Sequence, residues 1–388
     1  MKNKYRFWII TLICICSLSR LQAQTDSIRY RLDSLVSSPL LQYSQLGLMV
    51  YDLTADSVLY TYNARQTMRP ASTMKLLTSV TALDVLGANY HFRTALYYTG
   101  SVRDSVLTGD VFCVGGMDPL FDDDDMQAFA HSVRALGIHT LRGRIVTVST
   151  FKDADLLGEG WCWDDDNPKL TPLLINRKNE FAYRFLLALD RDSIFVDGPN
   201  AYGGLPRNAK LLTTRKHALT DVLEPMMKNS DNLFAEAMFY QIGAATGARP
   251  AKASHARREI QKVLQQAGAS GPCKIADGSG LSLYNYVSAE LLTRLLIYAY
   301  RKPDVIRYLY DALPLAGDDG TLKTRMKDTP AQYNVRAKTG TLTGISSLAG
   351  YAQTSDCHML AFCIINQGVL KNAEGRRFQD QVCTALCK

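Results

Sequence analysis

The sequence predicts an α/β fold in which two halves of one domain flank an inserted, mainly β domain. Three observations predict it. Strand and helix patterns open the chain, short apolar runs broken by Gly and Asp follow from about residue 94, and helical patterns leading to three strand patterns close it. With 388 residues, 47% of them hydrophobic, the chain is long enough for two domains. We predict a discontinuous domain over residues 24–95 and 207–388 and an inserted domain over 96–206.

Residues 1–23 have the pattern of a secretory signal peptide, with a basic start, an apolar run over 7–18 and a small residue, Ala23, at the cleavage site. The run is only twelve residues long, short of the roughly 20 that cross a bilayer, so we expect export without a stable membrane anchor. The formal charge of +7 includes four basic and no acidic residues in this segment, which leaves +3 for the rest. So mild a charge does not indicate nucleic-acid binding.

Seven cysteines follow the signal segment, and an odd number cannot all pair within one chain. Cys113 and Cys363 lie in apolar, strand-like runs, which favours buried thiols. Cys383 and Cys387 lie four apart on the last predicted helix, a spacing too weak to assign a bond. Export permits disulfides, and the sequence leaves their pairing open.

The first elements are a hairpin and a helix. Residues 46–53 and 57–62 are rich in strand formers and are separated by three residues, which predicts two paired strands. Pro70 then precedes a helical apolar pattern over 72–86, and Gly87 ends it.

The elements after the insert are predicted from the same signals. Apolar spacing typical of helices recurs three times, three strand-like runs follow, and a last helix closes the chain. These segments are helices at 219–227, 233–242 and 289–300, strands at 335–342, 347–353 and 359–366, and a helix at 373–387.

Ser72 and Lys75 form an S-x-x-K motif at the start of a predicted helix. Positions three apart lie on one helix face, so the ammonium can reach the hydroxyl. A serine hydroxyl needs a base to become a nucleophile. Lysine can serve if desolvation or a second cation lowers its pKa from about 10.4. Alone the motif is weak, because a helix-capping serine beside a solvated lysine gives the same pattern.

Ser230, Asp231 and Asn232 open another predicted helix. The alternative is an ordinary helix cap, because all three residue types are favoured there. In a functional interpretation, the serine hydroxyl relays protons between the base and the leaving amine. The asparagine amide then holds the lysine and the substrate backbone.

The run Lys338, Thr339, Gly340 and Thr341 lies within the predicted strand 335–342. A glycine in mid-strand often marks the close approach of another backbone, here expected to be a substrate peptide added along an edge strand. Lys338 supplies positive charge, and the two threonine hydroxyls could bind a terminal carboxylate. The alternative is an edge strand that carries lysine to prevent aggregation.

Each motif is modest alone, but the order S-x-x-K, S-x-N and K-T-G, each on the expected kind of element, is that of enzymes that acylate an active-site serine. This combination predicts serine acyl transfer. The chemistry requires neither a metal ion nor a cofactor.

These motifs and their neighbours closely resemble the low-molecular-mass, class C penicillin-binding proteins over nearly the whole chain after the signal segment. The matching stretches are 69–75 (RPASTMK), 228–232 (KNSDN) with 235–236, 277–281 (DGSGL), 336–341 (RAKTGT) and 109–119 in the insert. The resemblance implies a penicillin-binding-protein/β-lactamase-like transpeptidase domain, an antiparallel sheet flanked by helices, with an inserted domain. It also implies a periplasmic D-alanyl-D-alanine carboxypeptidase/endopeptidase that acts on peptidoglycan stem peptides and is acylated by β-lactams.

The resemblance also implies roles for the motif residues. Ser72 attacks the carbonyl between two D-alanines, and water resolves the acyl-enzyme. Lys75 is the base and Ser230 relays the proton. Asn232 and Lys338 position the reacting groups.

Further roles implied by the resemblance concern the oxyanion and the stem-peptide side chain. The backbone N–H groups of Ser72 and Thr341 form the oxyanion hole. Asp118, Arg325 and Leu342 are the specificity candidates, with Asp118 suited to a free amino group on the substrate. An ordinary turn aspartate is the alternative for that residue.

Two other functions compete with this interpretation. A β-lactamase shares the acylation step, but its tyrosine-based class has Tyr where Ser230 stands, and no separate Glu motif for deacylation is recognisable. A non-catalytic wall-binding or β-lactam-sensing protein would not need the complete motif set.

Two acidic runs and two tryptophans are given no functional role. Asp122 to Asp125 and Asp164 to Asp166 are expected on solvated loops, because adjacent aspartates repel and lack the spacing of a calcium loop. Trp161 and Trp163 are expected to pack.

Overall fold

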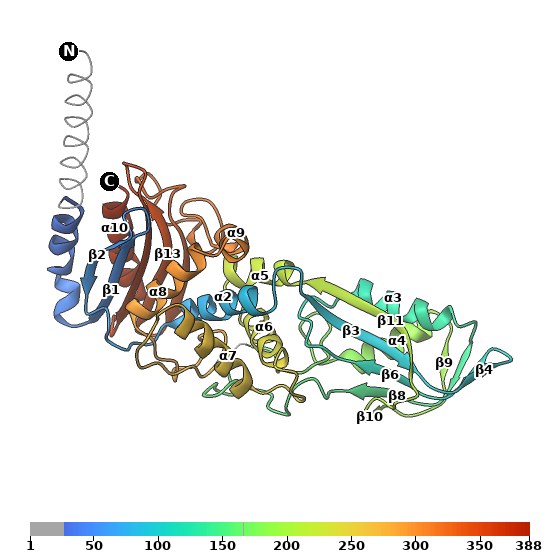
Figure 1. Ribbon diagram of the computed structural model, residues 1–388. Helices are drawn as coiled ribbons and strands as arrows, with labels where there is room; N and C mark the ends of the chain where they lie inside the picture. Colours follow the sequence, from blue (N-terminus) through green and yellow to red (C-terminus); the bar gives the residue numbers. More distant parts are fainter. Residues whose placement is uncertain (1–26, 166) are drawn as a thin grey trace, which may run out of the picture.

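The computed structural model describes residues 27–165 and 167–388. The predicted signal peptide lies outside these residues. The molecule is elongated, with a broader part that carries both ends of the described chain and a narrower part that projects from it (Figure 1). Within the described ranges, no helix is long and apolar enough to cross a membrane.

The broader part is built on a five-stranded antiparallel sheet in the order β12-β13-β14-β1-β2, so β12 is an edge strand. The two predicted strands of the opening hairpin and the three at the end of the chain are confirmed. The strands are β1 (Gln45–Asp52), β2 (Ser57–Tyr62), β12 (Arg336–Leu342), β13 (Ile345–Gln353) and β14 (Met359–Gln367).

Helices cover both faces of this sheet. Alternate residues of β13 belong to different cores: Leu348 packs with residues of the last helix, whereas Ala349 packs with the helices of the other face. This alternation follows from the two-residue period of a strand. The predicted antiparallel sheet flanked by helices is thus confirmed. The helices are α2 (Lys75–Val85), α5 (Leu219–Lys228), α6 (Asn232–Ala244), α7 (Ala253–Gln266), α8 (Ala289–Tyr300), α9 (Pro303–Ala312) and α10 (Asn372–Leu386).

Two of these helices lie at the centre of the broader part and place the candidate site. Residues 233–244 of α6 and 75–83 of α2 are buried on all sides, as expected of helices enclosed by other helices. The predicted helix over 72–86 has a different start: Ala71–Met74 is a 3-10 helix, η2, and α2 begins only at Lys75.

The narrower part contains two further sheets, in the orders β10-β8-β6-β3-β11 and β4-β5-β7-β9, and two helices. Strand β3 starts five residues before the predicted insert, 96–206, and β11 lies wholly after it, at 210–218. The strands are β3 (His91–Tyr98), β4 (Ser101–Arg103), β5 (Val106–Thr108), β6 (Val111–Val114), β7 (Thr140–Arg142), β8 (Ile145–Val148), β9 (Phe195–Val196), β10 (Ala201–Tyr202) and β11 (Lys210–Ala218); the helices are α3 (Asp123–Arg134) and α4 (Phe181–Arg191). This part has a core of its own, in which four phenylalanines pack together.

The expectation of a solvated loop at Asp122 to Asp125 is wrong. Asp122 is the N-cap of α3, and it forms a reciprocal capping box with Asp125. The other two aspartates occupy the first turn, where the helix dipole favours negative charge. Asp125 is buried and binds Arg215. The repulsion expected among adjacent carboxylates is therefore offset by the helix terminus and an arginine.

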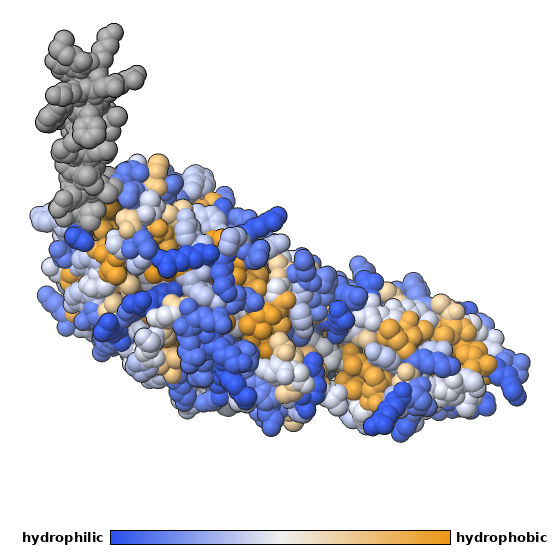
Figure 2. Space-filling view, in the orientation of Figure 1, coloured by the Kyte–Doolittle hydropathy of each residue, from blue (hydrophilic) through white to orange (hydrophobic). Residues whose placement is uncertain are grey.

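All seven cysteines in the described ranges are free, and Cys113 and Cys363 are buried as predicted. On the face shown in Figure 2, hydrophobic residues gather in several separate patches among polar ones. Trp161 is packed as expected, but Trp163 is 90% exposed, so packing is the wrong expectation for that residue.

Candidate active site

Ser72 and Lys75 meet where η2 joins α2. Ala71 has a positive φ of 49°, a strained conformation for a residue with a side chain, and it turns the chain sharply before Ser72. The Lys75 Nζ donates a hydrogen bond to Ser72 Oγ at 3.0 Å. The one-face geometry expected of S-x-x-K is therefore present, although the serine lies on a 3-10 turn.

Lys75 is fully buried, and its ammonium is held by three oxygens. Besides Ser72 Oγ, it donates to Asn232 Oδ1 at 2.7 Å and to the Ser279 carbonyl at 2.8 Å. Burial lowers the pKa of Lys75 from 10.5 to about 8, because the charged form loses its hydration. Nearby carboxylates oppose this shift without cancelling it, namely those of Asp277, Glu236 and Asp231. A lysine with such a pKa supplies a neutral amine near neutral pH.

The Ser230–Asn232 segment combines the two interpretations that the sequence left open. Asp231 is the N-cap of α6, and its side chain accepts a hydrogen bond from the Phe234 N–H. Ser230 has a positive φ of 61°, and its hydroxyl lies against Lys338, while Asn232 binds Lys75. The aspartate caps the helix, and the residues on either side of it face the cluster.

Lys338 is the second buried amine of the site. Its Nζ donates to Ser230 Oγ at 2.8 Å and to the Thr339 carbonyl at 2.9 Å. Burial and the Lys75 ammonium hold the pKa of Lys338 well below 10.5. The Thr339 hydroxyl donates to Thr321 Oγ1 at 2.8 Å. The structure thus brings three segments distant in the sequence together, as two hydrogen-bonded groups that adjoin at residues 230–232.

Gly340 has a different neighbour from the one predicted. A methyl group at Gly340 would lie 2.2 Å from Ser347 Oγ, 2.6 Å from the Pro70 carbonyl oxygen and 3.0 Å from the Ser72 backbone nitrogen. The close approach of these protein atoms is enough by itself to require a glycine here. The residue is small because the segment that carries Ser72 packs directly on β12.

Two of the three specificity candidates are occupied by other partners. The Asp118 carboxylate is buried and lies 2.7 Å from His217 Nδ1, and it raises the pKa of that imidazole by accepting its hydrogen bond. Arg325 donates to Asp380 Oδ1 at 2.7 and 2.9 Å and to Gln379 on α10. The structure does not bring either side chain into the cluster around Ser72.

The third specificity candidate lies at the end of the edge strand. Leu342 is the last residue of β12 and is half-buried. Its carbonyl oxygen accepts a hydrogen bond from the Asn372 side chain at 2.9 Å. Leu342 therefore lies two residues beyond Gly340, on the strand that carries Lys338.

The sequence missed two contributors to the site, Ser279 and Glu236. The motif analysis gives Ser279 no role, yet its carbonyl is one of the three partners of Lys75. Glu236 lies one helical turn beyond Asn232 on α6, and it accepts hydrogen bonds from the backbone N–H groups of Gly278 and Ser279. Both lie in stretches that carry the family resemblance, which was the only signal that pointed to them. In the described part of the chain, no group of three or more potential metal-binding side chains occurs.

A family model described as the D-Ala-D-Ala carboxypeptidase 3 (S13) family matches residues 28–174 and 180–387. The chain belongs to this family. The S13 chain is 27% identical to a D-alanyl-D-alanine carboxypeptidase of Actinomadura sp. over 445 residues, covering 89% of this chain and 82% of the relative. It is a serine-type hydrolase of the D-alanyl-D-alanine carboxypeptidase kind, as predicted.

Solved structures agree with this fold. Penicillin-binding protein 4 from Haemophilus influenzae superposes with a TM-score of 0.83 at 23% identity, covering 91% of this S13 chain and 98% of that one. The same protein has also been solved in complex with a β-lactam, with a TM-score of 0.78 at 24% identity and coverage of 91% and 99%. A predatory endopeptidase from Bdellovibrio bacteriovorus has a TM-score of 0.58 at 14% identity, covering 87% and 91%. The transpeptidase-like fold is therefore confirmed.

Proposed function

We propose that this S13 enzyme cleaves the terminal D-alanyl-D-alanine bond of peptidoglycan stem peptides through an acyl-enzyme on Ser72. The observation that carries the proposal is the 3.0 Å contact between the Lys75 Nζ and the Ser72 Oγ, in a buried setting that lowers the pKa of the lysine to about 8. Such an amine can accept the hydroxyl proton as the serine attacks.

The proposed reaction runs in two halves. Lys75, as the neutral amine, takes the proton of Ser72, whose Oγ forms a bond to the carbonyl carbon. The backbone N–H groups of Ser72 and Thr341 stabilise the resulting oxyanion. The proton that Lys75 took then passes through Ser230, which is hydrogen-bonded to Lys338, to the leaving nitrogen, so that D-alanine departs and Lys75 is neutral again. Water then attacks the ester, Lys75 takes a proton from that water, and it delivers this proton to the departing Ser72 Oγ, which regenerates the hydroxyl.

The edge position of β12 supports a peptide substrate. An extended stem peptide can add to the free edge by main-chain hydrogen bonds, with the hydroxyls of Thr339 and Thr341 and the charge of Lys338 beside its terminal carboxylate. The Actinomadura relative is named a carboxypeptidase and the Bdellovibrio neighbour an endopeptidase. We accordingly propose both trimming of stem peptides and cleavage of crosslinks as activities of this site. Leu342, at the end of the same strand, stays a candidate contact for the stem-peptide side chain.

Labelling with a fluorescent penicillin, followed by a D-alanine assay with a D-Ala-D-Ala stem peptide, tests the proposal. Wild type should become labelled and should release D-alanine, while Ser72→Ala should do neither. Ser101→Ala, at an exposed serine of β4, should behave as wild type. A wild-type protein that neither labels nor releases D-alanine, or a labelled Ser72→Ala variant, contradicts the proposal.

The β-lactamase alternative differs in the second half-reaction. No glutamate contacts Ser72 or Lys75 by a hydrogen bond among the described residues, so we expect the penicilloyl ester to be released slowly. Rapid turnover of a chromogenic cephalosporin would favour the β-lactamase.

We further propose that the enzyme works outside the cytoplasmic membrane, in the periplasm. The signal-like pattern of residues 1–23 and the location of peptidoglycan support this. Detection of the mature protein in an osmotic-shock fraction, with its new N-terminus near Gln24, is the expected result.

A further inference from the structure

The third partner of Lys75 is a backbone atom on a separate loop. The Ser279 carbonyl belongs to the segment 277–285, here named the 277–285 loop. Its oxygen accepts a hydrogen bond from the Lys75 Nζ at 2.8 Å. The other two partners are side chains, and one of them is the reacting serine itself. The direction in which the amine points therefore depends on where the 277–285 loop is held.

Glu236 holds this loop against α6. Its Oε1 accepts hydrogen bonds from the backbone N–H groups of Gly278 at 3.0 Å and of Ser279 at 2.8 Å. The residue is 1% exposed and lies four positions after Asn232, on the same helix face. One turn of α6 thus supplies both a direct partner of Lys75 and the anchor of its backbone partner.

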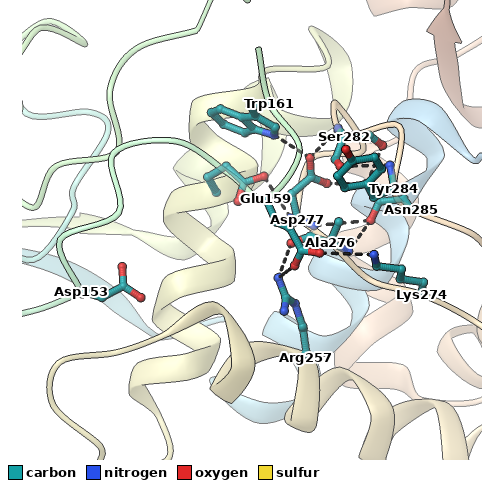
Figure 3. Close-up of polar contacts among 12 residues, drawn as sticks. Asp153, Glu159, Trp161, Arg257, Lys274, Ala276, Asp277, Ser282, Tyr284 and Asn285 are labelled. Carbon is teal, nitrogen blue, oxygen red and sulfur yellow. Dashed lines mark hydrogen bonds and ion pairs between the residues drawn. The ribbon is translucent and has the colours of Figure 1, made fainter. Parts of the chain in front are cut away.

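The internal shape of the 277–285 loop has a different origin. Asp277 accepts hydrogen bonds from within the loop and from Trp161 in the connection between β8 and α4, and Figure 3 shows the donors Trp161, Ser282 and Asn285 around its carboxylate. The donors are the backbone N–H groups of Gly280 and Ser282 and the side chains of Asn285 and Trp161. Asp277 shapes the loop, whereas Glu236 fixes it relative to the helix that carries Asn232.

We propose that Glu236 is a positioning residue for Lys75, because its carboxylate fixes the Gly278–Ser279 backbone and so aims the Ser279 carbonyl at the Lys75 ammonium. This inference rests on the proposed role of Lys75 as the base. An amide oxygen could satisfy the same two N–H donors. Beyond anchoring the loop, the ionised carboxyl group of Glu236 places a negative charge near Lys75.

That charge affects the ionisation of Lys75. Burial and the Asp277 carboxylate raise the pKa of Glu236 to about 8, and the ionised Glu236 favours the protonated form of Lys75. Asp231 and Asp277 act in the same direction, and Lys338 on β12 is the facing cation. Removing the Glu236 charge leaves the other groups in place and lowers the pKa of Lys75.

Two substitutions separate anchoring from charge. Glu236→Gln keeps an acceptor for the two N–H groups and removes the charge, whereas Glu236→Ala removes both. Glu224→Gln, at an exposed glutamate on α5, is the matched control. The readouts are the second-order rate of acylation by fluorescent penicillin between pH 6 and 10, and hydrogen–deuterium exchange of the 277–285 loop.

For Glu236→Gln we expect normal exchange and, over the pH range in which wild-type Glu236 is ionised, an acid limb of the rate profile displaced to lower pH. For Glu236→Ala we expect faster exchange at residues 278–279 and a rate at least about tenfold lower, since small misplacements of a catalytic group are costly. Glu224→Gln should match wild type in both measurements.

An acid limb of Glu236→Gln that coincides with wild type overturns the inference, as does unchanged exchange in Glu236→Ala. If Glu236→Ala does not fold, the Glu236→Gln profile decides alone. Failure of the proposed function is recognised separately, because wild type itself then stays unlabelled. In that case the role of Lys75 as base, and the inference built on it, are both rejected.

Discussion

At the scale of single residues, the site is dominated by two buried amines, each hydrogen-bonded to a serine hydroxyl of its own. Lys75 binds the Ser72 hydroxyl and Lys338 binds the Ser230 hydroxyl. Each ammonium disfavours a second positive charge nearby, and burial acts in the same direction. The outcome is a lysine that can lose its proton near neutral pH without a dedicated general-base histidine or glutamate.

Gly340 offers a test of how tightly the Ser72 segment is seated on β12. In Gly340→Ala the new methyl group would overlap the Pro70 carbonyl oxygen and Ser347 Oγ. We expect the Ser72 segment to shift, the acylation rate to fall by roughly 10², and the free energy of unfolding to drop by about 1–3 kcal/mol. Fluorescent-penicillin kinetics and urea denaturation measure the two effects.

Gly204 supplies the control for this substitution. It has no positive φ, and a methyl group there meets nothing within 4 Å. Gly204→Ala should therefore leave both acylation and stability unchanged. Wild-type kinetics in Gly340→Ala would mean that this close contact does not position the serine.

Sequence reasoning at this scale succeeded for side chains with a motif and failed for groups without one. The structure brings together Ser72, Lys75, Ser230, Asn232 and Lys338 as the motif order predicts. The Ser279 carbonyl could not be predicted, because every residue has such an oxygen. The pairing of Arg325 with Asp380 was not predicted, because nothing in a sequence indicates that a charged side chain will pair with a residue on a distant helix.

At the scale of elements, the start of α6 sets the geometry of two site residues. Asp231 caps the helix and also pairs with Arg177 of the narrower part. Because Ser230 and Asn232 adjoin this cap, fraying of the first turn would displace both. The helix terminus is thus both a stability feature and part of the site.

Asp231→Ala tests this coupling. We expect a loss of about 0.5–2 kcal/mol in the free energy of unfolding, as is typical for an N-cap, together with slower acylation. Asp122→Ala removes the N-cap of α3, so it should cost similar stability without slowing acylation. Equal acylation rates in the two variants would show that the cap at Asp231 does not position the site.

The elements themselves were predicted unevenly. Helices such as α8 (Ala289–Tyr300), with a clear apolar stripe and a capping Ser288, were placed to the residue. Helix α3 was missed because its first turn is entirely acidic, and that pattern was interpreted as a charged loop. Helix α7 was not predicted, although its few buried residues, Ala256, Ile260, Val263 and Leu264, recur at helical spacing among polar ones.

At the scale of the whole molecule, the narrower part is fastened to loops that bear on the active site. Trp161 Nε1 donates to Asp277 Oδ2 at 2.8 Å. Glu159 pairs with Arg257 and Lys274, and Figure 3 shows these residues gathered beside Asp277. No local pattern predicts such contacts, because their partners lie about a hundred residues apart in the chain.

These contacts imply that the inserted segment supports catalysis as well as any binding role. Trp161→Phe retains an aromatic ring but removes the N–H donor, so one hydrogen bond to the buried Asp277 is lost. Asp277 Oδ2 keeps the Ser282 N–H, so the loss is that of one hydrogen bond, about 0.5–1.5 kcal/mol, and we expect a lower melting temperature and a several-fold slower acylation, with the loop less protected from hydrogen exchange. Trp163→Phe, at the neighbouring tryptophan that is 90% exposed, should change none of these. If Trp161→Phe is destabilised but is still acylated at the wild-type rate, the hydrogen bond from Trp161 to Asp277 stabilises the protein without positioning Lys75.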